Sequence, residues 1–289
     1  MIHWIKLWLL AARPKTLSAS ITPVLMGTSL ACIDGFFHWL AAGSAMVAAL
    51  LIQIGTNFAN DYFDFQKGAD TQERLGPIRM VQSGAISPEA MKKVMFITFA
   101  LALIPGFYLL FRGGFPILII GLSSIILGYL YTGGPKPLGY LGLGDFLVLI
   151  YFGPVAVGGT YFVQTLEINS VVLLSGLAPG FLSVALLAVN NLRDADTDAE
   201  AGKKTLAVKF GKTFTKFEYL ISIVIAGGIP FFIQPSGRPW FASLVCIFTL
   251  PAIMKIFREE DSTELIKALE ITGKVMLFYG FAFSLGVLL

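Results

Sequence analysis

Apolar residues in this 289-residue chain occur in long runs that are separated by shorter polar segments. An α-helix needs roughly 17 to 22 apolar residues to cross a hydrocarbon layer about 30 Å thick. Nine runs meet this requirement, and we expect a transmembrane helix in each: 17–33, 40–59, 94–111, 115–131, 146–164, 171–191, 218–234, 239–256 and 272–289. Residues 4–8 hold two tryptophans and a lysine, which is typical of an interfacial anchor rather than a cleaved signal.

The composition agrees with this pattern. The chain is 56% hydrophobic and 13% charged, with a mean hydropathy of +0.77, whereas soluble domains are about a quarter charged. We therefore expect an all-α integral membrane protein, a bundle of nine transmembrane helices around a central cavity. Residues 1–289 are expected to form a single domain, with cytoplasmic cap loops at about 60–93 and 192–217. Two cysteines and two histidines without metal-binding spacing argue against zinc, haem and iron–sulfur sites.

Charged residues are distributed unequally between the two sides of the expected membrane. All but Arg112 and Arg238 of the 21 lysines and arginines belong to the N-terminus and to the loops after even-numbered spans. The positive-inside rule places these segments in the cytoplasm and the C-terminus outside. All but Asp34 and Glu167 of the 18 acidic residues lie on the same side. Because acidic residues contribute little to that rule, their placement indicates a cytoplasmic site.

Two long cytoplasmic loops open with similar acidic motifs, NFANDYFD at 57–64 and NNLRDADTD at 190–198. If the preceding helices continue, positions i, i+3, i+4 and i+7 bring one set of side chains onto one helix face. That face carries Asn57, Asn60, Asp61 and Asp64 in the first motif, and Asn191, Asp194 and Asp198 in the second. Asp196 is expected to point elsewhere. The repetition suggests an internal duplication.

Four converging carboxylates would repel one another unless a cation lies between them. Mg²⁺ prefers oxygen ligands and commonly combines one or two carboxylates with phosphate oxygens. Two Mg²⁺ would balance Asp61, Asp64, Asp194 and Asp198 and leave coordination sites for a diphosphate. Nearby cations could neutralise its remaining charge: Lys67, Arg74, Arg79, Lys136, Arg193, Lys203 and Lys204. A diphosphate with a lipid-soluble isoprenoid tail would explain why such a site belongs to a membrane bundle.

Other interpretations use the same residues. The aspartates could be solvated helix ends, and Gln53 could form either an interhelical hydrogen bond or part of the pocket. Asp145 could cap a helix or orient a substrate. A divalent-cation transporter would need ligands near the bilayer midplane, where this chain has almost no ionisable residues. A CDP-alcohol phosphotransferase would carry a DGxxAR motif, which is absent.

The two aspartate motifs resemble those of the UbiA-type intramembrane prenyltransferases. Further stretches resemble the 1,4-dihydroxy-2-naphthoate polyprenyltransferase branch (MenA): ARPKTL at 12–17, GPIR at 76–79, YTGGPKPLGY at 131–140, LGD at 143–145 and GKKTLAV at 202–208. The broader family spaces its first motif as NDxxDxxxD, whereas here residue 68 is Gly and the next carboxylate is Asp70. A Gly-x-Asp ending is expected in the naphthoate branch. The role of Asp70 stays open between a metal ligand and a partner of Arg74 or Lys67.

The resemblance implies nine helices and transfer of a polyprenyl group from its diphosphate to 1,4-dihydroxy-2-naphthoate, with loss of CO₂, to give demethylmenaquinone. It implies Mg²⁺ on Asp61, Asp64, Asp194 and Asp198, supported by Asn57, Asn60 and Asn191. Arg79, Lys136 and Lys204, with Lys67, would bind the diphosphate or the aromatic carboxylate, and Tyr131 would face the allylic cation. Another acceptor, such as 4-hydroxybenzoate, homogentisate, haem or a glycerol phosphate, would use the same metal site.

Overall fold

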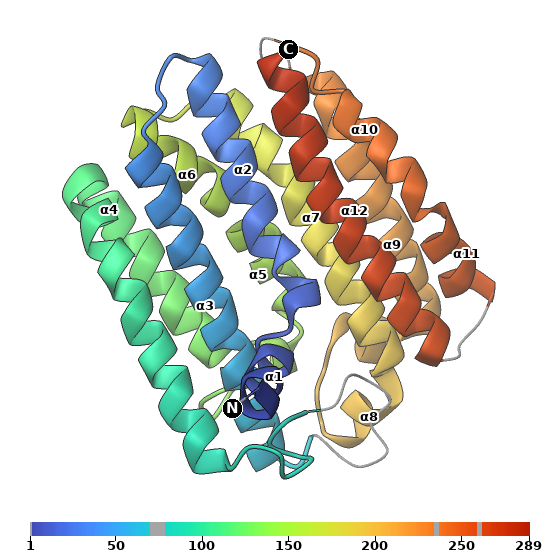
Figure 1. Ribbon diagram of the computed structural model, residues 1–289. Helices are drawn as coiled ribbons and strands as arrows, with labels where there is room; N and C mark the ends of the chain where they lie inside the picture. Colours follow the sequence, from blue (N-terminus) through green and yellow to red (C-terminus); the bar gives the residue numbers. More distant parts are fainter. Residues whose placement is uncertain (1, 70–78, 234–236, 259–261) are drawn as a thin grey trace.

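The computed structural model describes residues 2–69, 79–233, 237–258 and 262–289. Every regular element in these ranges is a helix, and the long helices lie side by side in one bundle (Figure 1). The expectation of an all-α protein is confirmed. The elements are α1 (Ile2–Ala12), η1 (Pro14–Thr16), α2 (Ser18–Ile33), α3 (Trp39–Gln66), α4 (Pro88–Leu130), η2 (Gly139–Leu141), α5 (Gly144–Ile150), η3 (Tyr151–Val155), α6 (Ala156–Thr165), α7 (Ser170–Arg193), α8 (Ala195–Glu200), α9 (Leu206–Phe232), α10 (Phe241–Val245), η4 (Cys246–Thr249), α11 (Leu250–Arg258) and α12 (Ser262–Leu288).

Helix α4 is a hairpin rather than one straight rod. Gly114 has φ 64° and ψ −152°, a conformation that only glycine adopts without strain. The chain reverses there, so the ring of Phe96 in the first half lies 6.2 Å from the ring of Tyr129 in the second. Both halves run alongside α3 at the edge of the bundle (Figure 1). The expected spans 94–111 and 115–131 are the two arms of this hairpin.

Among the described residues, seven helical segments are long and apolar enough to cross a membrane, with α5 to α6 and α10 to α11 each counted as one. An eighth candidate is the pair formed by α1 and α2, which is bent by 56°. The molecule is therefore a multi-pass membrane protein. This count treats the two arms of α4 as one helix. Helices α3 and α9 also extend well into the two expected cap loops.

Helix α7 lies at the centre of the larger buried core, between α2, α9 and α12. Hydroxyl groups join these helices: Tyr219 bonds to Thr272 at 2.9 Å, and Tyr279 donates to the carbonyl of Ala226 at 2.9 Å. A second buried cluster joins the C-terminal half of α3 to the first half of α4. This rigid framework fixes where the ends of α3 and α7 lie.

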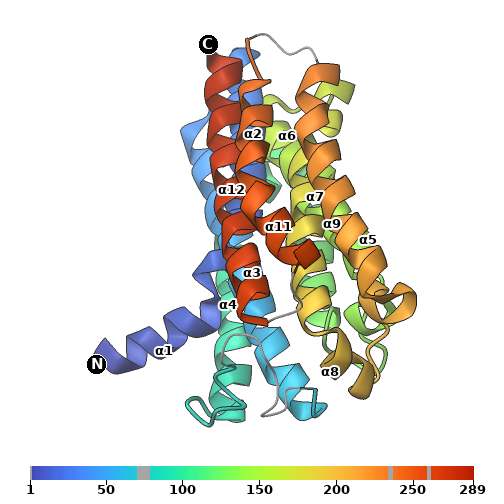
Figure 2. The same ribbon diagram turned by 90° about the vertical axis from the view of Figure 1, so that its right-hand side faces the viewer.

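Helix α1 projects sideways from the bundle, near the end that carries α8 (Figure 2). The indole of Trp4 is exposed, whereas Trp8 packs edge-on against Phe58 of α3, with ring centroids 5.6 Å apart. The C-terminus lies at the opposite end of the bundle.

Candidate active site

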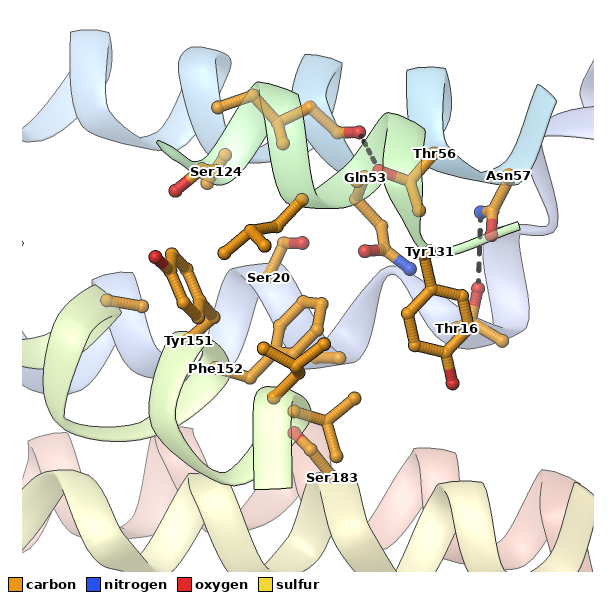
Figure 3. Close-up of a pocket in the computed structure, with 18 of the residues that line it drawn as sticks. Thr16, Ser20, Gln53, Thr56, Asn57, Ser124, Tyr131, Tyr151, Phe152 and Ser183 are labelled. Atoms are coloured by element: carbon orange, nitrogen blue, oxygen red, sulfur yellow. Dashed lines mark hydrogen bonds between the residues drawn. The ribbon is translucent and has the colours of Figure 1, made fainter. Parts of the chain in front are cut away.

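A cavity of about 720 Å³ opens inside the bundle, between α2, α3, α4, α6 and α7. Its body is lined mostly by apolar side chains, and its charged residues gather where α3 and α7 end. Figure 3 shows Gln53 of α3, Tyr131 at the end of α4, and Tyr151 and Phe152 of η3 reaching into this space. The cavity therefore combines a polar end with a long apolar interior.

One face of α3 supplies much of the polar wall. Asn57, Asn60 and Asp64 line the cavity, as the i, i+3, i+7 spacing predicted, and Gln53, one turn earlier, lines it too. Asn57 donates to the carbonyl of Ala12 at 2.9 Å, which holds the corner between α1 and α2 against α3. Asn60 accepts a hydrogen bond of 2.9 Å from the hydroxyl of Thr132. Both amides thus brace neighbouring segments at the edge of the site.

Asp61 is placed differently from the other residues of its motif. It is buried and is not among the residues that line the cavity. Its two carboxylate oxygens accept hydrogen bonds from the backbone N–H groups of Met80 and Val81, at 3.0 and 3.1 Å. These bonds fix the turn that immediately follows Arg79. In this arrangement Asp61 positions that arginine, while its expected role as a metal ligand stays a prediction.

Asp64 accepts two hydrogen bonds at the end of α3 and forms an ion pair with a nearby lysine. Arg79 Nη2 and the hydroxyl of Tyr140 each lie 2.9 Å from one of its oxygens, and Lys203 Nζ lies 3.6 Å away. The same Lys203 ammonium is 3.2 Å from Asp198. One cation therefore joins the two aspartate motifs, which are more than 130 positions apart in the sequence.

The second motif does not form a single continuous helix. Helix α7 ends at Arg193 and α8 begins at Ala195, so Asp194 lies at the junction. The guanidinium of Arg193 binds both oxygens of Asp194, at 2.7 and 2.6 Å. Asn191, Asp194 and Asp198 all line the cavity. Burial raises the pKa of Asp198, and the neighbouring Lys203 partly opposes that shift.

Tyr131 follows directly after α4 and also lines the cavity. Burial raises the pKa of its hydroxyl well above the usual value, and the nearby carboxylates of Asp145, Asp64 and Asp198 raise it further. The hydroxyl therefore keeps its proton at neutral pH and can donate a hydrogen bond. Its ring faces the cavity, as expected for a group that contacts substrate.

The other expected cations lie outside the cavity lining. Lys67 donates to the carbonyls of Thr132 and Gly134 and lies 5.0 Å from the centroid of the Tyr140 ring. Burial lowers the pKa of Lys67. The side chains of Lys136 and Lys204 are exposed. Those three lysines, which the sequence assigned to the diphosphate or the acceptor, thus surround the site without entering it.

Two acidic residues outside the four candidates also have defined positions. Asp196 pairs with Lys212 at 2.8 Å and is largely exposed, pointing away as predicted. Asp145 lies in the first turn of α5, but the N-cap is Leu143, so the capping interpretation of Asp145 is wrong. The positions of Asp70 and Arg74 fall outside the described residues.

Sequence reasoning missed Tyr140. The residue was part of a recognised motif, but nothing in its spacing linked it to an aspartate on α3. Its hydroxyl donates to Asp64, and its ring lies 5.0 Å from the Lys203 ammonium. The loop between α4 and α5, with its short helix η2, carries this side chain to the end of α3.

The side chains at the polar end of the cavity can be compared with what a metal ion requires. Within the described ranges, no three carboxylate, histidine or cysteine side chains lie close enough to enclose one. Mg²⁺ bound with phosphate oxygens needs only one or two carboxylates. Asp64 and Asp198 meet this requirement, and the Lys203 ammonium between them shows that their arrangement suits a cation. The residues therefore fit a metal–diphosphate site better than an all-protein metal cage.

Comparison with known proteins identifies the family. Residues 20–281 match the UbiA prenyltransferase family. The chain belongs to this family. A 1,4-dihydroxy-2-naphthoate octaprenyltransferase of Haemophilus influenzae is 34% identical, with 99% of this chain and 96% of the relative aligned. A protein of the same name from Mycobacterium tuberculosis is 37% identical, over 95% of this chain and 94% of the relative.

The fold agrees with this assignment. A UbiA homologue from Archaeoglobus fulgidus, solved with GPP and Mg²⁺ bound, superposes with a TM-score of 0.64. The alignment covers 98% of this chain and all of that one, at 16% identity. The expected membership of the UbiA prenyltransferases is confirmed, and the protein is a membrane-bound transferase.

Proposed function

We propose that this UbiA-family enzyme transfers a polyprenyl group from its diphosphate to 1,4-dihydroxy-2-naphthoate, with loss of CO₂ and diphosphate, to form demethylmenaquinol, the hydroquinone form of demethylmenaquinone. The observation that carries the proposal is a single cavity with two chemically distinct regions: a charged end around Asp64, Asp198 and Lys203, and a long apolar interior. Such a cavity suits a substrate with a diphosphate head and a hydrocarbon tail. The names of the full-length relatives support the naphthoate acceptor.

Charge balance supports binding of a metal–diphosphate at the polar end. Three carboxylates there pair with three cations: Asp64 with Arg79, Asp194 with Arg193, and Asp198 with Lys203. If two Mg²⁺ replace these cations on the carboxylates, Arg79, Arg193 and Lys203 become available to the diphosphate oxygens. Bound Mg²⁺ would supply Lewis-acid stabilisation of the charge that develops on the departing diphosphate.

The residues of the chain have separate roles in the reaction. Arg79 and Lys203 bind and orient the leaving diphosphate, and Asp61 keeps the turn that carries Arg79 in place. Tyr131, with its protonated hydroxyl, presents an aromatic face that tolerates the allylic cation and excludes water. The naphthoate ring forms the new carbon–carbon bond as the allylic carbon–oxygen bond breaks, and the ring carboxylate leaves as CO₂.

We further propose that the single 1–289 domain crosses the membrane nine times. The helix count supports this if each arm of the α4 hairpin crosses once, since the arms of 26 and 16 residues are about 39 and 24 Å long. Helix α2, at about 24 Å, supplies the remaining crossing. The distribution of lysine and arginine then favours a cytoplasmic N-terminus and active site and an external C-terminus.

The acceptor can be tested directly. Purified protein in liposomes receives one polyprenyl diphosphate, Mg²⁺ and equal concentrations of 1,4-dihydroxy-2-naphthoate, 4-hydroxybenzoate and homogentisate. Mass spectrometry is expected to detect the prenylated, decarboxylated naphthoate as the main product. Preferential prenylation of either other acceptor would overturn the naphthoate assignment while leaving the prenyltransferase chemistry intact.

A further inference from the structure

The ring of Tyr131 packs against two glycines that follow it in the chain. A Cβ on Gly144 would lie 2.7 Å from the tyrosine hydroxyl oxygen, and a Cβ on Gly139 would lie 3.0 Å from ring carbon Cε1. Both distances are shorter than the ordinary contact of about 3.5 Å. The N–H of Gly139 also donates to the carbonyl of Tyr131 at 2.9 Å, which fixes this turn against the ring. Tyr131 thus occupies space that exists because neither residue has a side chain.

Gly144 lies behind the hydroxyl of Tyr131. It is buried in the first turn of α5 and does not line the cavity, whereas Tyr131 does. Leu187 of α7 borders the same position, with its Cδ2 3.2 Å from where the Cβ would be. Because the hydroxyl is attached to a planar ring, it cannot move unless the ring turns about its two side-chain torsions. A side chain at position 144 would therefore push the ring of Tyr131 toward the cavity, where open space lies.

We propose that Gly144 is a positioning residue: by leaving room for the hydroxyl, it sets how far the ring of Tyr131 reaches into the cavity. This inference rests on the proposed function, in which that ring faces the allylic cation. A displacement of about 1 Å near the reacting carbon can lower the rate about 100-fold. The glycine is needed for space and not for backbone freedom, since its φ is not positive and alanine favours helix formation.

The test compares Gly144→Ala with Gly144→Ala/Tyr131→Phe. In the first variant the new methyl group meets the hydroxyl oxygen. In the second that oxygen is absent, and the nearest remaining ring atom, Cζ, lies at an ordinary 3.5 Å.

The variants are assayed in liposomes with octaprenyl diphosphate, 1,4-dihydroxy-2-naphthoate and Mg²⁺. We expect Gly144→Ala alone to lower kcat at least about tenfold. KM for the donor should change less than about threefold, because the diphosphate end around Arg79 and Lys203 is unaltered. In the Tyr131→Phe background the same exchange should lower kcat less than about twofold.

Gly158→Ala is the matched control. Gly158 lies in α6 and does not line the cavity, and a Cβ there would lie 3.2 Å from Leu173 Cδ2. This position has the leucine contact of Gly144 without the tyrosine. The kcat of the control should stay within about twofold of that of the unsubstituted protein.

Melting temperatures detect the steric coupling between residues 144 and 131 even without transfer. The change in melting temperature caused by Gly144→Ala should be less favourable in the unsubstituted protein than in the Tyr131→Phe background. Additive changes in melting temperature, an equal fall in kcat in both backgrounds, or an unchanged kcat in Gly144→Ala would overturn the positioning role. Absence of transfer by the unsubstituted protein, with the coupling in melting temperature intact, would instead refute the proposed function.

Discussion

Asp64 of α3 and Asp198 of α8 lie on either side of one ammonium group, with Lys203 Nζ 3.6 Å from the first carboxylate and 3.2 Å from the second. The two residues are far apart in the sequence. The ends of α3 and α7, held by the central core, bring them together.

Removing either carboxylate should abolish transfer without unfolding the protein. In Asp64→Asn and Asp198→Asn the amide keeps the size of the side chain but binds Mg²⁺ poorly, so we expect the rate to fall at least about 100-fold. Asp196→Asn is the control, because Asp196 lies on the same short helix and is exposed. Its rate should stay within about twofold. An equal loss of transfer rate in all three variants would refute the assignment of Asp64 and Asp198 to the metal site.

Lys203 should stabilise the metal-free protein by occupying the position of a cation. Lys203→Met leaves Asp64 and Asp198 without this partner, and we expect a loss of about 1 to 3 kcal/mol of stability in EDTA. Added Mg²⁺ should then raise the melting temperature of the variant more than that of the unsubstituted protein. Melting curves at increasing Mg²⁺ measure this difference, and an equal or smaller rise in the variant would contradict the shared-cation account.

Asp61 should act through structure rather than through metal. In Asp61→Asn the amide N–H₂ group faces a backbone donor of Met80 or Val81, which costs about 1 to 3 kcal/mol. We expect the melting temperature to fall by the same amount with and without Mg²⁺. A variant that melts normally in EDTA but gains no stability from Mg²⁺ would identify Asp61 as a ligand instead.

Tyr131 should not titrate in the working range of the enzyme. Because its pKa is raised, its hydroxyl stays protonated above pH 10, where a free tyrosine loses its proton. The pH–rate profiles of the unsubstituted protein and Tyr131→Phe should therefore have the same shape between pH 6 and 10, even if their rates differ. A basic limb that disappears in Tyr131→Phe would show that this hydroxyl ionises.

The sequence predicted the all-α membrane fold because lipid requires long apolar runs whatever their partners, but it did not show which runs join into one helix, as the two arms of α4 do. It placed the end of α3 and the start of α9 less well, since both helices extend into polar segments that the apolar pattern does not mark. Helical spacing correctly brought Asn57, Asn60 and Asp64 to the cavity. It could not foresee that the backbone at Met80 and Val81 would bind Asp61, nor that a loop would carry Tyr140 to Asp64, because neither contact follows a helical period.

The most direct test of the central claim is the mass of the product that purified protein forms from octaprenyl diphosphate and 1,4-dihydroxy-2-naphthoate in liposomes. With Mg²⁺ the account predicts a product carrying the octaprenyl group and lacking the carboxyl group, and no product in EDTA or with Asp64→Asn. A product formed equally well in EDTA, or no transfer with Mg²⁺ present, would contradict it.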